Sequence, residues 1–168
     1  MNRTIDNINI AITKALAKGH ILVHGLAEAV IIRESEDKIL PAIVCHDGEC
    51  DVNLFDDLYD AGFYHKLNGI TYNEVAGWGD DVRKQSVHDM SIIVYGKREC
   101  ISPYAMEKLV CDAIGQASKG DIICMPVSAD FNRLQVFAGE FSGYPFFLQP
   151  EVFLFKVNYR ITINPINC

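Results

Sequence analysis

The segment VFLFKVNYRITI, residues 152–163, constrains the fold most strongly, because its alternate residues form one apolar set and one mixed set. One set of alternate residues is apolar or aromatic throughout: Phe153, Phe155, Val157, Tyr159, Ile161 and Ile163. The other set is mixed: Val152, Leu154, Lys156, Asn158, Arg160 and Thr162. Successive side chains of a β-strand point to opposite faces of the sheet. The pattern therefore predicts a long strand with one face on a core and one mixed face.

Two helices are predicted by apolar residues that recur at three- and four-residue spacing. The first covers residues 4–18, where Ile5, Ile8 and Ile12 share one face and Gly19 follows as a stop. The second begins at Ser102-Pro103, because Ser is a favourable N-cap and Pro fits the first helical position. Its apolar stripe continues to Ala117, and Gly120 ends it.

Further strands are predicted on both sides of the second helix. Residues 29–32 and 39–45 flank the polar turn ESEDK and predict a β-hairpin. Residues 87–95 are rich in β-branched side chains, and the segments IICMPVS and RLQVFAGEFSG also favour β-structure. We expect an α+β fold, with a largely antiparallel β-sheet and two α-helices packed on one of its faces. A chain of 168 residues suits a single domain over residues 1–168.

Residues 53–85 mix aromatic residues, Asp and Gly without a sustained period. We expect a long, partly ordered loop, with a short helical turn at 54–60 and a hairpin at Asn68-Gly69. Long loops in compact domains tend to be functional or disordered. Two interpretations stay open for its aromatic side chains, which either form a contact surface or pack back onto the core. These side chains are Phe63, Tyr64, Tyr72 and Trp78.

The stretch CHDGEC, residues 45–50, is where cysteine, histidine and acidic residues crowd together. Asp47-Gly48 is a signal for a two-residue hairpin turn, which would place Cys45 opposite Cys50. A zinc site needs about four ligands, and this hairpin offers only Cys45, His46 and Cys50. A hairpin turn is the favoured interpretation, with a metal site and a reactive thiol as alternatives.

Catalytic and targeting motifs are missing from the sequence. It contains no nucleophile elbow, no P-loop, no dinucleotide-binding glycine motif and no H-E-x-x-H. His88 and Asp89 are neighbours on a predicted strand and would point to opposite faces. We therefore expect no enzyme and no cofactor. The N-terminal residues lack the unbroken apolar stretch of a secretory signal, and no apolar run is long enough to span a membrane.

The order of elements resembles that of the tail-terminator and tail-completion (neck) proteins of tailed bacteriophages. It is similar in particular to connector ring proteins of the crAss-like phages of Bacteroidales. The resemblance lies in an N-terminal helix, a hairpin containing ILPAIV, the strand DMSIIVYG, a Ser-Pro-capped helix and the final strand LFKVNYRITI. It implies a structural virion protein that forms a homo-oligomeric ring in the neck or tail, assembled in the host cytoplasm. Portal or adaptor and tail-tube proteins would be its neighbours.

In such a ring DNA would pass through the lumen without sequence-specific binding. The formal net charge of −7 agrees with this, because holding DNA by its phosphates requires a basic surface. The candidate acids of the lumen are Asp56, Asp57, Asp80 and Asp81. The candidate contacts with other subunits or partners are Asp47, Gly48, Phe63, Tyr64, Tyr72 and Trp78. Two alternatives remain: a monomeric binding module of a mobile element, and a small zinc or thiol protein using the CHDGEC stretch.

Overall fold

The structure is a computed structural model that describes residues 2–26, 29–35, 38–44, 50–51, 59–76, 82–140 and 149–165. Side chains are described for residues 3–23, 59–76, 82–140 and 149–165. The elements are α1 (Asn2–Ala17), β1 (Val23–Leu26), β2 (Ala29–Ser35), β3 (Lys38–Val44), β4 (Cys50–Asp51), β5 (Ala61–Ala76), β6 (Val82–Lys97), α2 (Pro103–Gln116), β7 (Ile122–Asp130), α3 (Arg133–Glu140) and β8 (Val152–Ile163).

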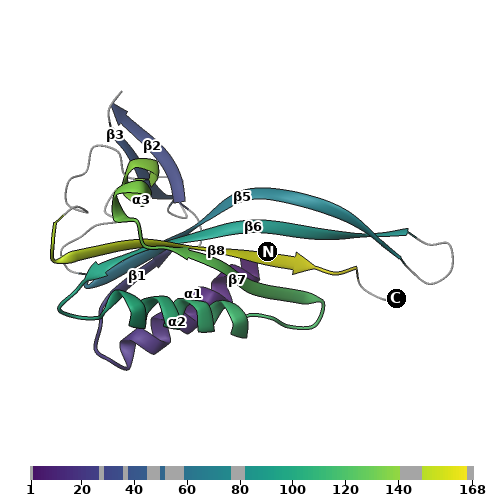
Figure 1. Cartoon of the computed structure of the whole chain (residues 1–168), viewed down its shortest axis with the longest axis horizontal. Helices are drawn as coiled ribbons and strands as arrows, with labels where there is room; N and C mark the ends of the chain where they lie inside the picture. Colours follow the sequence, from purple (N-terminus) through teal and green to yellow (C-terminus); the bar gives the residue numbers. More distant parts are fainter. Residues whose placement is uncertain are drawn as a thin grey trace.

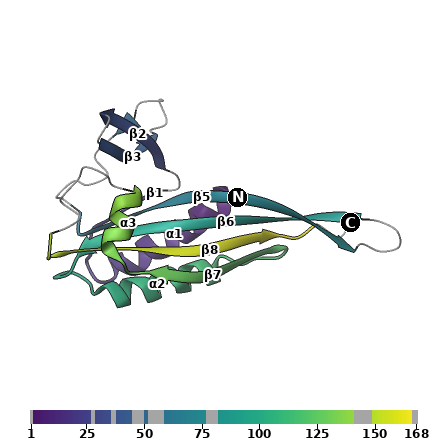
Figure 2. The same ribbon diagram turned by 45° about the horizontal axis from the view of Figure 1, so that its top comes forward.

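The main sheet has five strands in the order β1-β5-β6-β8-β7. Strands β5, β6, β8 and β7 are antiparallel to their neighbours, whereas the short β1 runs parallel to the start of β5. A smaller sheet with the order β2-β3-β4 lies beside α3 (Figures 1 and 2). The α+β class with a largely antiparallel sheet is therefore confirmed.

The core lies between the main sheet and helices α1 and α2, which cover the same face (Figure 1). The sheet contributes every second residue of β8, from Phe153 to Ile161, and all of them are buried. The predicted alternation of this strand is thus confirmed. Helix α1 contributes Ile5, Ile8 and Ile12, the residues that share its predicted apolar face.

A third helix covers part of the opposite face, so the expectation of two helices is wrong in number. Helix α3 occupies most of the segment RLQVFAGEFSG, which we had predicted as a strand. Asn132 explains the difference, because its side-chain oxygen accepts a hydrogen bond from the N–H of Gln135 at 3.3 Å and so caps a helix. Val136 is buried, and Glu140 binds Lys66 of the sheet at 3.0 Å.

Most of the predicted loop at 53–85 is instead a long β-hairpin formed by β5 and β6. The two strands pair from Ala61–Gly96 as far as Ala76–Val82. Asn68-Gly69 is not a turn; it lies where the pairing register shifts between Leu67 and Gly69. The sequence lacks a strand signature here because residues 67–74 are exposed on both faces, so no apolar alternation is required.

The first predicted hairpin is confirmed, since β2 and β3 pair antiparallel. The prediction that Cys45 lies opposite Cys50 is wrong, because Cys50 pairs with Val44 and Asp51 with Ile43. A one-residue change of register moves side chains to the other face of a strand. Cys45, His46, Asp47 and Gly48 themselves lie outside the described residues.

Two glycines allow aromatic rings to lie directly on the strands. A methyl group at Gly62 would come within 2.0 Å of the Tyr95 hydroxyl oxygen. One at Gly96 would come within 2.6 Å of the Phe153 ring. Glycine at these positions therefore permits close packing on both faces of the sheet.

Candidate interaction surface

The β5–β6 hairpin extends beyond the rest of the main sheet (Figure 1). Strand β8 ends at Ile163, which pairs with Ser86, so residues 82–85 of β6 pair only with β5. We call residues 67–76 and 82–88 the β-arm. Its outer part, residues 73–76 and 82–85, is a two-stranded ribbon, which is at best marginally stable in water on its own. The end of the β-arm would therefore be stabilised by a contact with another molecule.

Exposed apolar side chains lie along the β-arm. Leu67 and Ile70 each keep 41% of their surface exposed, and Tyr72 keeps 67%. Ile70 pairs with His88, and Tyr72 pairs with Ser86. Both side chains therefore lie on the face of the sheet that α1 and α2 cover. Clustered exposed apolar residues of this kind mark interaction sites more often than isolated ones do.

The outer edge of β7 is blocked from Ile122 to Pro126 by the protein itself. The Ser118 hydroxyl accepts from the N–H of Cys124 at 2.9 Å and donates to its carbonyl oxygen at 3.2 Å. The backbone N–H and carbonyl of Ile122 are both bonded to Lys119. Pro126 has no N–H to offer. Proteins protect edge strands against pairing with other chains by devices of this kind.

Apart from the register shift at Leu67–Gly69, the outer edge of β5 has no comparable protection. Strand β1 pairs with residues Ala61–Tyr64 only. Beyond Tyr64, no strand in the described part of the chain pairs with this edge. Residues 67–74 there are all exposed, and none of them is proline. The two edges of the main sheet thus differ: one is capped and the other can accept a strand.

The structure separates the predicted contact residues. Phe63 is fully buried in the core, and Tyr64 is 2% exposed beneath α3, so neither can form a surface contact in the folded monomer. Their assignment as contact residues is therefore wrong, while Tyr72 is exposed as the contact interpretation requires. The remaining candidates lie outside the described residues: Asp47, Gly48, Asp56, Asp57, Trp78, Asp80 and Asp81.

A buried polar contact that the sequence analysis missed is centred on His65. Its ring nitrogens lie 2.7 Å from the Tyr159 hydroxyl and 2.7 Å from Oδ1 of Asn9. Burial lowers the pKa of His65 to about 3, so the ring is neutral at neutral pH. The contact links α1, β5 and β8. His65 follows Phe63 by two residues, so on a strand the two side chains share the core face. This spacing indicates burial of His65 only once residue 65 is known to lie on a strand.

A row of hydrogen bonds crosses the opposite face of the main sheet. The Asn68 amide donates to the Ser91 hydroxyl at 2.7 Å, and that hydroxyl donates to Oδ1 of Asn158 at 2.8 Å. The Asn158 amide in turn donates to the Ser128 hydroxyl at 3.0 Å. These four side chains come from β5, β6, β8 and β7. Because the Asn68 side chain bonds Ser91 across the face of the sheet, it does not cover the backbone at the outer edge of β5.

The described cysteines are poorly suited to nucleophilic chemistry. Burial is the main cause that raises the pKa of Cys100 and Cys124, and it raises that of Cys111 to about 12 with help from Glu107. A thiol with a raised pKa is rarely in the reactive thiolate form. Among the side chains that the structure describes, no three His, Cys, Asp or Glu residues lie close enough together to hold a metal ion.

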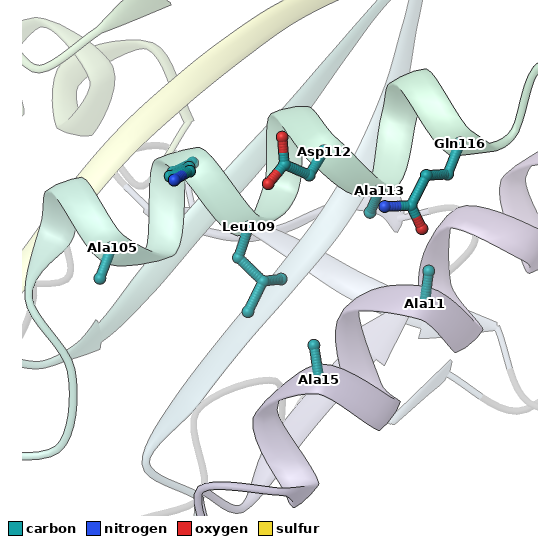
Figure 3. A pocket seen from close by; sticks show the side chains of 8 residues that line it. Ala11, Ala15, Ala105, Leu109, Asp112, Ala113 and Gln116 are labelled. Atoms are coloured by element: carbon teal, nitrogen blue, oxygen red, sulfur yellow. The ribbon is translucent and has the colours of Figure 1, made fainter.

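A shallow groove of about 330 Å³ runs between α1 and α2 (Figure 3). Ala11 and Ala15 of α1 face Leu109, Asp112 and Gln116 of α2 across it. Its walls offer Lys108, Asp112 and Gln116 among alanine and leucine side chains, and Lys108 and Asp112 are exposed residues of opposite charge. The groove therefore gives less indication of a specific partner than the β-arm does.

Comparison with known proteins adds no relative from which a role could be carried over. No protein-family model matches the chain, and no curated protein matches it. None of the described helices is long and apolar enough to cross a membrane.

Proposed function

We propose that this chain is a structural virion protein that forms a ring in the neck or tail of a tailed bacteriophage, as a tail terminator or head–tail connector. DNA passes through the ring without sequence-specific binding. The ring contacts portal or adaptor proteins on one side and tail-tube proteins on the other. Its role is assembly and not turnover of a substrate.

The observation that carries the proposal is the β-arm. Ile70 and Tyr72 are exposed on the edge strand β5, and beyond them residues 73–76 and 82–85 leave the sheet as a two-stranded ribbon, so this part of the protein is suited to lie against a neighbouring subunit. The negative net charge also supports the proposal, because a channel for DNA must not bind phosphate groups tightly. The resemblance in element order to phage neck proteins is the reason for placing this ring in the neck or tail of a phage.

The test is the mass of the purified full chain in solution, measured by light scattering, with negative-stain imaging of the same sample. We expect a discrete multimer that images as a ring. Zinc content, measured on that sample, separates this proposal from a zinc protein built on Cys45, His46 and Cys50. A monomer with stoichiometric zinc would reject the ring.

A shortened β-arm tests the role of this segment. Deleting residues 73–76 together with residues 82–85 removes four complete cross-strand pairs and keeps the remaining register. We expect the body to stay folded and the multimer to be lost. Leu134→Ser, which changes an exposed apolar residue on α3, serves as the control and should leave the multimer intact. A multimer that survives the deletion would exclude the removed end of the β-arm as the contact.

A further inference from the structure

We infer that the outer edge of β5, around Thr71, pairs antiparallel with the same edge of a second copy of this chain about a two-fold axis. The inference goes beyond the proposed ring, because it names the strand, the direction and the symmetry of a contact. It requires self-association of the chain and does not depend on a role in a phage.

The difference between the two sheet edges leads to this symmetry. A head-to-tail extension of the main sheet would need two open edges, one on β5 and one on β7. The Ser118 hydroxyl and Pro126 leave the β7 edge unsuited to that role. A two-fold contact uses the same surface on both subunits, so the open edge of β5 is sufficient.

The residues of this edge are complementary to themselves in the antiparallel direction. With Thr71 on the two-fold axis, Ile70 of each copy lies opposite Tyr72 of the other, and the two Thr71 residues face each other. Pairs of aromatic with β-branched residues, and Thr–Thr pairs, are favourable across antiparallel strands. The register would cover the exposed apolar surface of Ile70 and Tyr72 in both copies.

The charge of the edge also selects the antiparallel direction. A parallel pairing in register would place Glu74 beside Glu74 of the partner subunit, which is unfavourable. The antiparallel pairing centred on Thr71 instead places the two Glu74 residues at opposite ends of the paired segment, where they do not face each other. A two-fold contact does not close a cyclic ring, so in a ring it would join subunits of two different rings.

The experiment is a scan of single cysteine variants over Gly69, Ile70, Thr71, Tyr72 and Asn73 in the full chain. In an antiparallel two-fold ladder only the residue on the axis lies opposite itself. After mild oxidation, we expect a cross-linked dimer of doubled mass for Thr71→Cys, with peptide mapping that shows position 71 joined to position 71. Ile123→Cys, at an exposed residue of the capped β7 strand, and the unaltered chain are the controls and should lack a cross-link at the scanned position.

A second variant tests the contact without oxidation. Ile70→Lys places a positive charge on the edge of β5 in each copy. We expect this variant to be a monomer in solution where the unaltered chain is a dimer. Ile123→Lys, the matched control, should retain the mass of the unaltered chain.

The outcomes separate this inference from the proposed function. Absence of self-linked dimer at all five positions, or equal linkage at all of them, would overturn the two-fold contact. A ring that shows no self-linkage would leave the proposed function standing and reject the inference. A dimer linked through position 71 that never forms a ring would support the inference and count against the proposed function.

Discussion

The Nδ1 atom of His65 lies 2.7 Å from the hydroxyl oxygen of Tyr159, across the intervening strand β6. Asn9 presents its side-chain oxygen to the other ring nitrogen, so Nε2 donates to Asn9 and Nδ1 accepts from Tyr159. Both ring nitrogens are thereby satisfied without a charge on the ring. A buried histidine thus joins α1 to two strands of the main sheet.

Removing the hydroxyl group of Tyr159 should destabilise the protein. Tyr159→Phe keeps the ring in the core but leaves a buried nitrogen of His65 without a donor, which costs about 1–3 kcal/mol. The free energy of unfolding from urea denaturation measures the loss. Tyr104→Phe, at an exposed tyrosine, should change it by less than about 0.5 kcal/mol. Equal effects of the two variants would contradict a specific role for the buried contact.

Stability should fall with decreasing pH because His65 stays neutral in the folded state. Its folded pKa of about 3 lies below the unfolded value of 6.5, so the unfolded chain binds more protons between these values. This contribution to stability is complete above pH 6.5 and is lost as the pH falls towards 3, by up to about 1.4 kcal/mol per unit.

Denaturation of His65→Gln over the same pH range isolates this residue. The variant should show a shallower fall in stability, whatever its absolute stability at neutral pH. Burial also lowers the pKa of His88, so part of the pH dependence should remain. An identical slope in the variant and in the unaltered chain would show that His65 does not contribute.

Gly62→Ala should destabilise the sheet. The added methyl group would overlap the Tyr95 ring, and forcing a ring out of a packed position costs about 1–3 kcal/mol. Gly115→Ala is the control, because nothing lies within 4 Å of the added methyl group there and alanine favours a helix by about 1 kcal/mol. Thermal denaturation should therefore shift in opposite directions for the two variants.

The hydrogen-bonded row across the sheet should be most sensitive at its buried member. Ser91 is 2% exposed, and Ser91→Ala leaves Asn68 and Asn158 without their shared partner, at a cost of about 1–3 kcal/mol. Ser128→Ala lies at the exposed end, where water replaces the lost hydroxyl group, and should cost less than about 0.5 kcal/mol. A larger loss at Ser128 than at Ser91, measured in urea, would contradict this view of the row.

Side-chain periodicity and helix capping predicted the elements whose signals lie within one segment of the sequence. From Phe155 to Ile161, strand β8 alternates between buried and more exposed side chains, because its core face is buried there. Helix α2 begins at Pro103 with Ser102 as its N-cap, as expected, and the Ser102 hydroxyl accepts from the N–H of Ala105 at 3.2 Å. Both signals depend on burial or hydrogen bonds between residues close in the chain, so they can be read without knowledge of the fold.

The β-arm and helix α3 could not be predicted in the same way. Residues 67–74 of the β-arm have no buried face, so they carry no period that distinguishes a strand from a loop. In α3, the alternation of Leu134 and Val136 imitates a strand, and the helix packs against a face of the sheet formed by distant residues. The error at Cys50 arose because the turn signal at Asp47-Gly48 favoured a register one residue away from the one observed.

The sequence by itself determined the α+β class, the N-terminal helix, the Ser102-Pro103 helix start and the strand that carries the core, because these follow from local periodicity and capping. Only the tertiary structure decided that Phe63 and Tyr64 are buried while Tyr72 is exposed. It also decided that Ser118 blocks one edge of the sheet and leaves β5 as the open one. Exposure and edge protection depend on which distant segments meet, and that information is not contained in any single stretch of the chain.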